Sequence, residues 1–243
     1  MGANILLTGA SGFLGSFIMK EYSNFPIKGL GRTKSDFNVD LACNIPSFEE
    51  RFDIVIHSAG KAHIVPKSEE EILEFRQINV VGTKNLLKGL TKTIPKQFVF
   101  ISSVSVYGVI EGESINETSP LICDDPYGES KVEAEEVVKK WCQNHDVLCT
   151  ILRLPLVVGV NPPGNLGSMI HGIQKGYYFN IAGGTAKKSM VLATDIAKFI
   201  LNAAEVGGTY NLTDGYHPNF NELSHCIAKQ MEKKLVHNIP MIM

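Results

Sequence analysis

Short apolar runs alternate with longer stretches of helical spacing through the first two thirds of the chain. Five runs are apolar on both faces, as strands of a buried parallel sheet are, and they occupy residues 4–8, 26–30, 54–57, 97–102 and 147–153. Amphipathic spacing between them predicts helices over residues 12–22, 72–90 and 127–145, with a break in the second helix near Asn79. This alternation is typical of an α/β protein with a doubly wound parallel sheet.

Beyond Pro155 the pattern loosens, and glycine and proline become frequent. Helical spacing returns over residues 168–175, 194–204 and 219–231, and a short strand is predicted over residues 209–212. We therefore expect residues 1–155 to form the main domain, and residues 156–243 to form a smaller C-terminal lobe interleaved with the sheet. At about 150 residues per domain, a chain of 243 residues fits one large domain with such an appendage.

A glycine-rich turn joins the first predicted strand to the first predicted helix. Gly9, Gly12 and Gly15 follow the spacing G-x-x-G-x-x-G. In this position Gly9 permits a tight turn, Gly12 lets the backbone approach a pyrophosphate, and Gly15 lets the helix pack close to the sheet. The helix start supplies free N–H groups and the positive end of a dipole. The motif therefore predicts a Rossmann-like dinucleotide site within residues 1–155, although a plain strand–helix turn is the alternative.

The end of the second predicted strand bears on which dinucleotide binds. An acidic residue there would bind the ribose 2′-hydroxyl and repel a 2′-phosphate, but the strand ends at Gly31 and Arg32. Arg32 is suited to charge-assisted bonds with a 2′-phosphate, unless it is only a solvated loop residue. The cofactor is thus NAD or NADP, with NADP favoured. Asp40 is a candidate partner of the adenine amino group, or else a turn aspartate.

A tyrosine and a lysine begin the long helix predicted over residues 127–145. Tyr127 and Lys131 are four residues apart and share a helical face. A lysine ammonium beside a phenol favours the phenolate, so Lys131 is expected to lower the pKa of Tyr127 and make it a general acid/base. Ser103 ends the strand over residues 97–102, at the sheet edge where a cofactor lies in such folds, and can polarise a hydroxyl or carbonyl group.

Three motifs, residues 8–15, 102–108 and 127–131, together resemble the extended short-chain dehydrogenase/reductase family. More narrowly, they resemble its NAD-dependent epimerase/dehydratase branch, which acts on nucleotide sugars. The resemblance implies that Ser103, Tyr127 and Lys131 are catalytic. With the residues argued above, the expected cofactor-binding residues are Gly9, Ser11, Gly12, Phe13, Leu14, Gly15, Arg32, Asp40, Leu41, Ser58, Ala59, Gly60, Asn79, Ile101, Ser102, Tyr127, Lys131 and Pro155.

Two departures from the family pattern narrow the reaction. Dehydratases of the family carry an acidic residue one or two places after the catalytic Ser or Thr, and Val104 and Ser105 stand there instead. This disfavours 4,6-dehydration and leaves C4 epimerisation or reduction of a 4-keto sugar. Substrate is expected to contact Ser103, Asn165 and Lys188, although Lys188 stands where the family usually has arginine and is otherwise one of a solvated lysine pair. The family also usually continues beyond the point where this chain ends, so the lobe is either truncated or reduced.

Composition excludes other classes of function. The 23 basic and 25 acidic residues give a net charge of −2, which disfavours nucleic acid as a partner. No apolar run reaches the roughly 18 residues needed to cross a membrane, and the start shows no signal peptide. Five scattered cysteines indicate reduced thiols in a cytoplasmic protein. No metal site is expected, because the histidines outside the third strand are dispersed, at His63, His145, His171, His217, His225 and His237.

The resulting hypothesis is an NAD(P)-dependent epimerase or ketoreductase of a nucleotide sugar, with hydride transfer at C4 and Tyr127 as acid/base. The alternatives are a non-catalytic NAD(P)-binding sensor and a reductase of a small non-sugar carbonyl. The family resemblance also implies a homodimer formed by the helices over residues 72–90 and 127–145. The second of these carries Val132, Val137, Val138 and Trp141, more apolar surface than one contact with the sheet needs.

Overall fold

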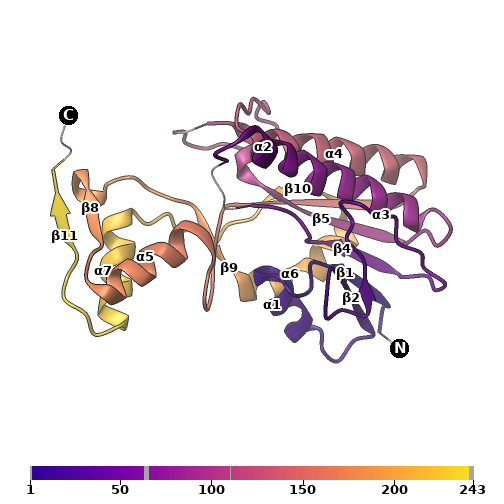
Figure 1. Cartoon of the computed structure of the whole chain (residues 1–243), viewed down its shortest axis with the longest axis horizontal. Coiled ribbons are helices and arrows are strands. Elements are labelled where there is room, and N and C mark those ends of the chain that lie inside the picture. Colours follow the sequence, from indigo (N-terminus) through magenta and orange to yellow (C-terminus); the bar gives the residue numbers. More distant parts are fainter. Residues whose placement is uncertain (1, 63–65, 110, 241–243) are drawn as a thin grey trace. The chain divides into compact units, whose positions relative to one another are not determined.

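A seven-stranded sheet, parallel throughout, organises the larger part of the chain (Figure 1). We analysed a computed structural model that describes residues 2–62, 66–109 and 111–240. The strand order is β10-β6-β5-β4-β1-β2-β3. The strands span β1 (Ile5–Thr8), β2 (Ile27–Gly31), β3 (Phe37–Asn38), β4 (Ile54–His57), β5 (Gln97–Ser103), β6 (Leu148–Leu154) and β10 (Gly208–Asn211). The doubly wound α/β fold expected from the sequence is confirmed.

Helices cover both faces of this sheet, which is why its central strands are apolar on both sides. The helices α1 (Phe13–Glu21) and α6 (Ala193–Val206) lie together on one face, where the Tyr22 hydroxyl donates a 2.7 Å hydrogen bond to the carbonyl of Ala197. The helices α2 (Glu69–Arg76), α3 (Gly82–Leu90) and α4 (Pro126–Asn144) lie on the other. The residues of β1 and β4 are all buried as a result.

The predicted break near Asn79 is a π-helical turn, Gln77–Val81, between α2 and α3. Asn79 is buried, and its side chain is engaged by the backbone of Lys61 outside the helix. The Thr83 hydroxyl donates a 2.6 Å hydrogen bond to the Asn79 carbonyl. The π-helical turn thus places the Asn79 side chain against the backbone of Lys61, in the segment that follows β4.

By its internal contacts the chain divides into two units, here called unit 1 and unit 2. Unit 1 contains the seven-stranded sheet and consists of the residues up to Leu154 together with Ala193–Leu212. Unit 2 consists of Pro155–Leu192 and the residues from Thr213 onward. The segment Ala193–Leu212, which the sequence analysis assigned to the smaller lobe, therefore belongs to the unit that holds the sheet, because it supplies α6 and the edge strand β10.

Unit 2 is built on two helices and two small sheets. The helices α5 (Gly164–Lys175) and α7 (Phe220–Gln230) enclose an apolar cluster that includes Leu166, Met169 and Ile173. The paired strands are β7 (Leu156–Val158) with β9 (Met190–Leu192), and β8 (Phe179–Ile181) with β11 (His237–Ile239). The sequence predicted none of these four strands, because three residues are too few for an alternation to emerge.

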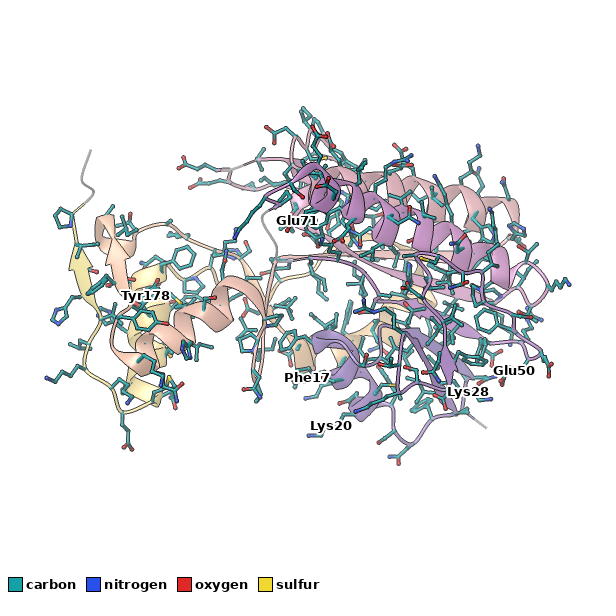
Figure 2. All side chains as sticks on the ribbon, in the orientation of Figure 1. Phe17, Lys20, Lys28, Glu50, Glu71 and Tyr178 are labelled. Carbon is teal, nitrogen blue, oxygen red and sulfur yellow. The ribbon has the colours of Figure 1, made fainter. Side chains whose placement is uncertain are left out.

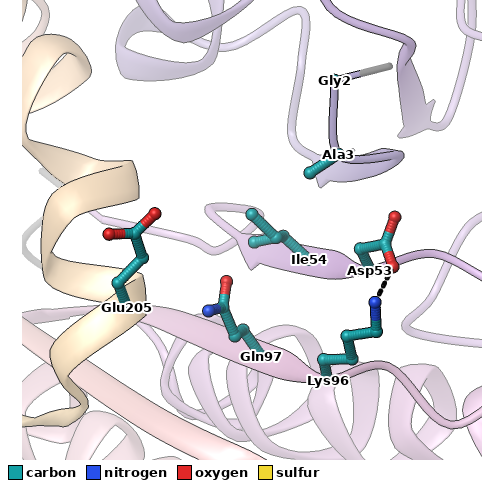
Figure 3. Close-up of a pocket in the computed structure, with 7 residues that line it drawn as sticks. All are labelled: Gly2, Ala3, Asp53, Ile54, Lys96, Gln97 and Glu205. Carbon is teal, nitrogen blue, oxygen red and sulfur yellow. Dashed lines mark ion pairs between the residues drawn. The ribbon is translucent and has the colours of Figure 1, made fainter.

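The amino ends of the strands form a charged edge of unit 1. A hollow of about 360 Å³ lies there, lined by Ile54 and Gln97, which begin β4 and β5, and by the Asp53–Lys96 ion pair at 2.9 Å (Figure 3). Lys28 and Glu50 form a second ion pair, at 2.5 Å (Figure 2). Since the strands are parallel, predicted functional residues at their carboxyl ends, such as Ser103, lie at the opposite edge. None of the helices in the described residues has the length and apolar composition needed to span a bilayer.

Candidate active site

Three neighbouring strands of unit 1 end at the carboxyl edge of the sheet with polar residues. β1 ends at Thr8, β4 at His57 and β5 at Ser103, and all three side chains are buried. Because the strands are parallel and adjacent in the order β5-β4-β1, the loops that follow them converge at one edge. The glycine turn and the predicted catalytic serine therefore share this edge.

The glycine turn has the geometry of a phosphate cradle. Gly9 has a φ of +71°, and a Cβ added to Gly15 would stand 2.1 Å from the Gly9 carbonyl oxygen, so neither position tolerates a side chain without a shift. Gly12 is the N-cap of α1, and no side chain in the described part of the chain caps this helix. The first N–H groups of α1 are thus left to bind an anion. These observations fit the pyrophosphate of a dinucleotide.

The segment after β4 closes against this turn. The Ala59 amide donates a 3.1 Å hydrogen bond to the Thr8 hydroxyl, and a Cβ on Gly9 would stand 2.8 Å from the Ala59 nitrogen. Two of the predicted cofactor-binding segments, residues 9–15 and 58–60, are therefore in direct contact.

His57 connects these segments to the π-helical turn, and the sequence analysis did not assign it a role. It is 2% exposed, with Nδ1 2.6 Å from the Thr8 hydroxyl and Nε2 2.8 Å from the Thr83 hydroxyl. Thr83 donates its own proton to the Asn79 carbonyl, so Nε2 carries the histidine proton and Nδ1 accepts from Thr8. Burial, with a smaller effect of the Lys131 charge, lowers the pKa of His57 to about 3, so the ring is neutral.

Asn79 extends this hydrogen-bonded chain to the helix that carries Tyr127. Its Nδ2 donates to the Ser130 hydroxyl at 2.9 Å and to the Lys61 carbonyl at 3.1 Å, and its Oδ1 accepts from the Lys61 amide at 2.7 Å. The Ser130 hydroxyl donates in turn to the Tyr127 carbonyl at 2.7 Å. A predicted cofactor-binding residue thus orients the first turn of α4.

The adenosine end of the predicted cofactor site lies at the end of β2. A Cβ on Gly31 would stand 3.9 Å from the Ser11 hydroxyl, so the glycine turn and the end of β2 are adjacent. Arg32 and Asp40 are exposed, and one Asp40 oxygen accepts from the Ala42 amide at 3.0 Å, which is a turn interaction. The sequence analysis missed Asp36, whose carboxylate accepts a 2.7 Å hydrogen bond from the Gly29 amide.

Ser103, Tyr127 and Lys131 come together at the carboxyl end of β5. Lys131 is 5% exposed, and its Nζ donates a 2.6 Å hydrogen bond to the Ile101 carbonyl and lies 4.1 Å from the centre of the Phe100 ring. Ser103 accepts a 3.1 Å hydrogen bond from the Ser105 amide, and a Cβ on Gly128 would stand 2.7 Å from the Ser105 carbonyl oxygen. The first turn of α4 therefore packs directly on the segment that follows Ser103.

The electrostatics of this cluster correct one expectation. Burial raises the pKa of Tyr127, and the neighbouring Ser103 side chain offsets this only in part, so the predicted lowering by Lys131 is wrong for this structure. The reason is geometric, because the Lys131 ammonium is directed at the Ile101 carbonyl. Burial also lowers the pKa of Lys131 to about 7, and the carboxylate of Glu135 opposes that change.

Three of the predicted residues, Pro155, Asn165 and Lys188, belong to unit 2. Pro155 follows β6 and is half-buried, whereas Asn165, in the first turn of α5, and Lys188 are exposed. A hollow of about 650 Å³ runs beside α5, lined by Ser168, His171 and Tyr177 among others.

Of the cysteines and histidines considered in the sequence analysis, the cysteines are all free thiols, and His63 lies outside the described residues. Within the described ranges, no three His, Cys, Asp or Glu side chains are grouped as a metal ion would require.

A comparison with models of protein families identifies the family to which the chain belongs. Residues 5–213 match the NAD dependent epimerase/dehydratase family. The chain belongs to this family. It is accordingly an enzyme, as the sequence resemblance indicated.

Similar proteins agree with the family assignment. The chain is 30% identical to the N-acetyl-alpha-D-glucosaminyl-diphospho-ditrans,octacis-undecaprenol 4-epimerase of Escherichia coli O157:H7, over 97% of this chain and 74% of that protein. It is 26% identical to the UDP-glucose 4-epimerase of Vibrio cholerae, over 96% of this chain and 77% of that protein. A solved UDP-N-acetylglucosamine 4-epimerase from Methanobrevibacter ruminantium M1, in complex with UDP-N-acetylmuramic acid, has a TM-score of 0.83 at 22% identity. This match covers 99% of this chain and 86% of that one.

Proposed function

We propose that the chain epimerises C4 of a sugar that is carried on a diphosphate, with NAD or NADP bound at the carboxyl edge of unit 1. The observation that carries this proposal is the convergence of the glycine turn and the Ser103, Tyr127 and Lys131 cluster at one sheet edge. The similarity to two 4-epimerases, which act on sugars with either a nucleoside or a polyprenol on the diphosphate, supports the reaction and the position.

The proposed cofactor site fits the residues present. Gly9, Gly12 and Gly15 with the open start of α1 would hold the pyrophosphate, and Asp40 and Arg32 would face the adenosine end. The other residues expected to hold the cofactor are Ser11, Phe13, Leu14, Leu41, Ser58, Ala59, Gly60, Asn79, Ile101, Ser102, Tyr127, Lys131 and Pro155. A nicotinamide bound there supplies a reversible hydride acceptor, which epimerisation at a carbinol carbon requires.

The proton of the sugar hydroxyl is handled by the chain itself. Tyr127 would take this proton as the hydroxyl is oxidised and return it to the same oxygen as the ketone is reduced, and C4 is inverted because its carbon accepts the hydride on the opposite face. Lys131 would favour the phenolate form once its ammonium leaves the Ile101 carbonyl and lies beside the phenol, and Ser103 would fix the sugar oxygen by hydrogen bonding. Since burial raises the pKa of Tyr127, a positive charge close to the phenol is needed before it can act as a base near neutral pH.

Two candidate substrates differ in the group that the diphosphate links to the sugar, which is either a nucleoside or a polyprenol. A nucleotide sugar follows from the sequence motifs, whereas a polyprenyl diphosphate sugar is favoured by the 30% identical relative. Asn165 and Lys188 of unit 2 are proposed to contact the diphosphate. The test is to incubate the chain with UDP-N-acetylglucosamine and with its polyprenyl diphosphate counterpart, and to detect the C4 epimer of each. Formation of neither epimer, with both cofactors supplied, would refute the proposed function.

The fate of the cofactor distinguishes an epimerase from the two alternatives, a ketoreductase and a non-catalytic sensor. A ketoreductase would consume one NADPH per product, and a sensor would bind the cofactor without turnover. The retained Ser103, Tyr127 and Lys131 cluster supports an enzyme over a sensor.

We also propose a homodimer through the face formed by α2 and α4. Val138 is fully buried, and Val137 and Trp141 pack against the core of their own chain. These three residues therefore give no support to a dimer interface. The exposed apolar side chains that support the proposal are Ile72 and Leu73 of α2, which are 42% and 66% exposed. Light scattering at micromolar concentration tests it, and a monomer that Leu73→Asp leaves unchanged in mass would contradict it.

A further inference from the structure

A buried ion pair lies one helical turn beyond Lys131. Glu135, on α4, accepts hydrogen bonds from Nε and Nη2 of Arg153, on β6, at 3.0 and 2.7 Å. The two residues are 1% and 2% exposed. A bidentate contact of this kind fixes both the distance and the relative orientation of the helix and the strand.

Each partner of the pair is tied to a further element of the site. The Ser102 hydroxyl, next to Ser103 on β5, donates a 2.6 Å hydrogen bond to Glu135 Oε1. Nη1 of Arg153 donates to the Tyr107 hydroxyl at 2.9 Å, and that hydroxyl donates to Oδ1 of Asn211, on β10, at 2.7 Å. The pair thus joins α4, β5, β6 and β10 at one point, one turn of α4 beyond Lys131.

Stability alone does not account for this arrangement. Desolvation of two charges offsets much of their attraction, and replacing a buried ion pair by apolar residues is often neutral or stabilising. Burial acts to raise the pKa of Glu135 but the bonds from Arg153 and Ser102 outweigh it, so the pKa is lowered and the group is a carboxylate. What an apolar pair would not reproduce is the fixed geometry and the negative charge on the face of α4 that carries Lys131.

We infer that Glu135 and Arg153 are positioning residues, which hold α4 and β5 in the register that places the Lys131 amine on the Ile101 carbonyl, two residues before Ser103. The inference rests on the proposed function only for the roles of Ser103 and Lys131. Glu135 lies four positions after Lys131 on α4, and Ser102 directly precedes Ser103 on β5, so a shift at the pair is passed directly to both groups. A displacement of about 1 Å in a reacting group is enough to lower turnover on the order of 10²-fold.

The test removes the pair without leaving a buried charge. In Glu135→Leu/Arg153→Met, which leaves the Ser102 hydroxyl without its acceptor, we expect the urea midpoint to fall slightly and the cofactor Kd to stay close to wild type, while kcat falls on the order of 10²-fold. The matched control is Lys28→Gln/Glu50→Gln, which removes a half-exposed ion pair at the opposite edge of the same sheet and should keep the wild-type kcat. A folded double variant with wild-type kcat, or one that loses kcat, cofactor affinity and stability together, would overturn the inference.

A second readout needs no substrate. Lys131 lies over the Phe100 ring, so its ε-methylene NMR signal should be shifted upfield by the ring current. This signal is assigned by its absence in Lys131→Arg. We expect the upfield shift to be lost in Glu135→Leu/Arg153→Met and kept in the control, and an unchanged shift in the folded variant would contradict the inference. If the double variant does not fold, Glu135→Gln, which keeps the shape of the side chain, is expected to show the same loss.

The two readouts separate this inference from the proposed function. If wild type fails to epimerise any substrate but the Lys131 signal moves as expected, the proposed function fails and the positioning role stands.

Discussion

The side-chain nitrogen of Lys131 donates a 2.6 Å hydrogen bond to the carbonyl oxygen of Ile101. This contact holds a lysine in the interior of unit 1, where burial lowers its pKa to about 7 from 10.5. The direction in which this amine points, and not only the four-residue spacing between Tyr127 and Lys131, therefore determines how the lysine affects the pKa of the tyrosine.

The first prediction concerns stability and pH. Between pH 7 and 10.5 the unfolded chain holds a proton on Lys131 that the folded chain has released, so this group makes the free energy of unfolding rise with pH over that interval. Wild type should therefore gain up to about 4 kcal/mol relative to Lys131→Met between pH 6.5 and 10, at about 1.36 kcal/mol per unit of pKa. Urea unfolding at both pH values measures this, with Lys140→Met, an exposed position on α4, as the control. A difference from Lys131→Met that is independent of pH would contradict it.

The second prediction concerns proton transfer. Tyr127→Phe keeps the ring, which packs beside Phe75 with 6.0 Å between ring centres, and removes only the hydroxyl. Turnover of an accepted substrate should fall about 10²–10⁴-fold, while the dissociation constant of the cofactor stays close to wild type. Steady-state kinetics and a cofactor titration provide the two values. Wild-type turnover in this variant would remove Tyr127 from the proposed reaction.

The third prediction concerns the choice of cofactor. A charge-assisted contact contributes about 1.5–3 kcal/mol, so Arg32→Ala should weaken NADP(H) binding roughly ten- to a hundredfold and change NAD(H) binding little. The carboxylate of Asp36, bound to the Gly29 amide, lies in the same loop and opposes a 2′-phosphate, so Asp36→Asn should strengthen NADP(H) binding. Arg51→Ala, whose side chain bonds to the Ile94 carbonyl, is the control. Equal losses for both cofactors in Arg32→Ala would exclude a phosphate contact.

The fourth prediction concerns the His57 relay. Thr83→Val removes the hydroxyl that accepts from His57 and donates to Asn79, leaving buried polar groups unpaired at a cost of about 1–3 kcal/mol. Thr83→Ser keeps that hydroxyl and should retain most of the stability. Denaturant unfolding distinguishes the two variants. If Thr83→Val lost no more free energy of unfolding than Thr83→Ser, the hydrogen bonds of the Thr83 hydroxyl would not be what stabilises this site.

The sequence predicted the sheet and most of the candidate site because both follow from patterns that are local in the chain. The strand Ile54–His57 and a break in the helix near Asn79 were predicted from apolar periodicity and the glycine turn from its spacing, whereas the π-helical form of the break was not predicted. His57 was overlooked because its partners, Thr8 and Thr83, are 49 and 26 residues away and only the fold joins them. The pKa of Tyr127 was predicted in the wrong direction because helical spacing places Lys131 on the same face but does not show where its amine points.

The measurement that tests the central claim most directly is the fate of a deuterium label at C4 of the sugar. With UDP-N-acetylglucosamine or its polyprenyl diphosphate counterpart labelled at C4, incubated in ordinary water with a catalytic amount of cofactor, NMR follows the label in the epimer. Transient oxidation at C4, with the hydride returned to the same sugar, predicts an epimer that keeps its deuterium and no net change in nicotinamide absorbance. Epimer that has lost its label to water, or product formed only as NADPH is consumed, would contradict the proposed epimerase.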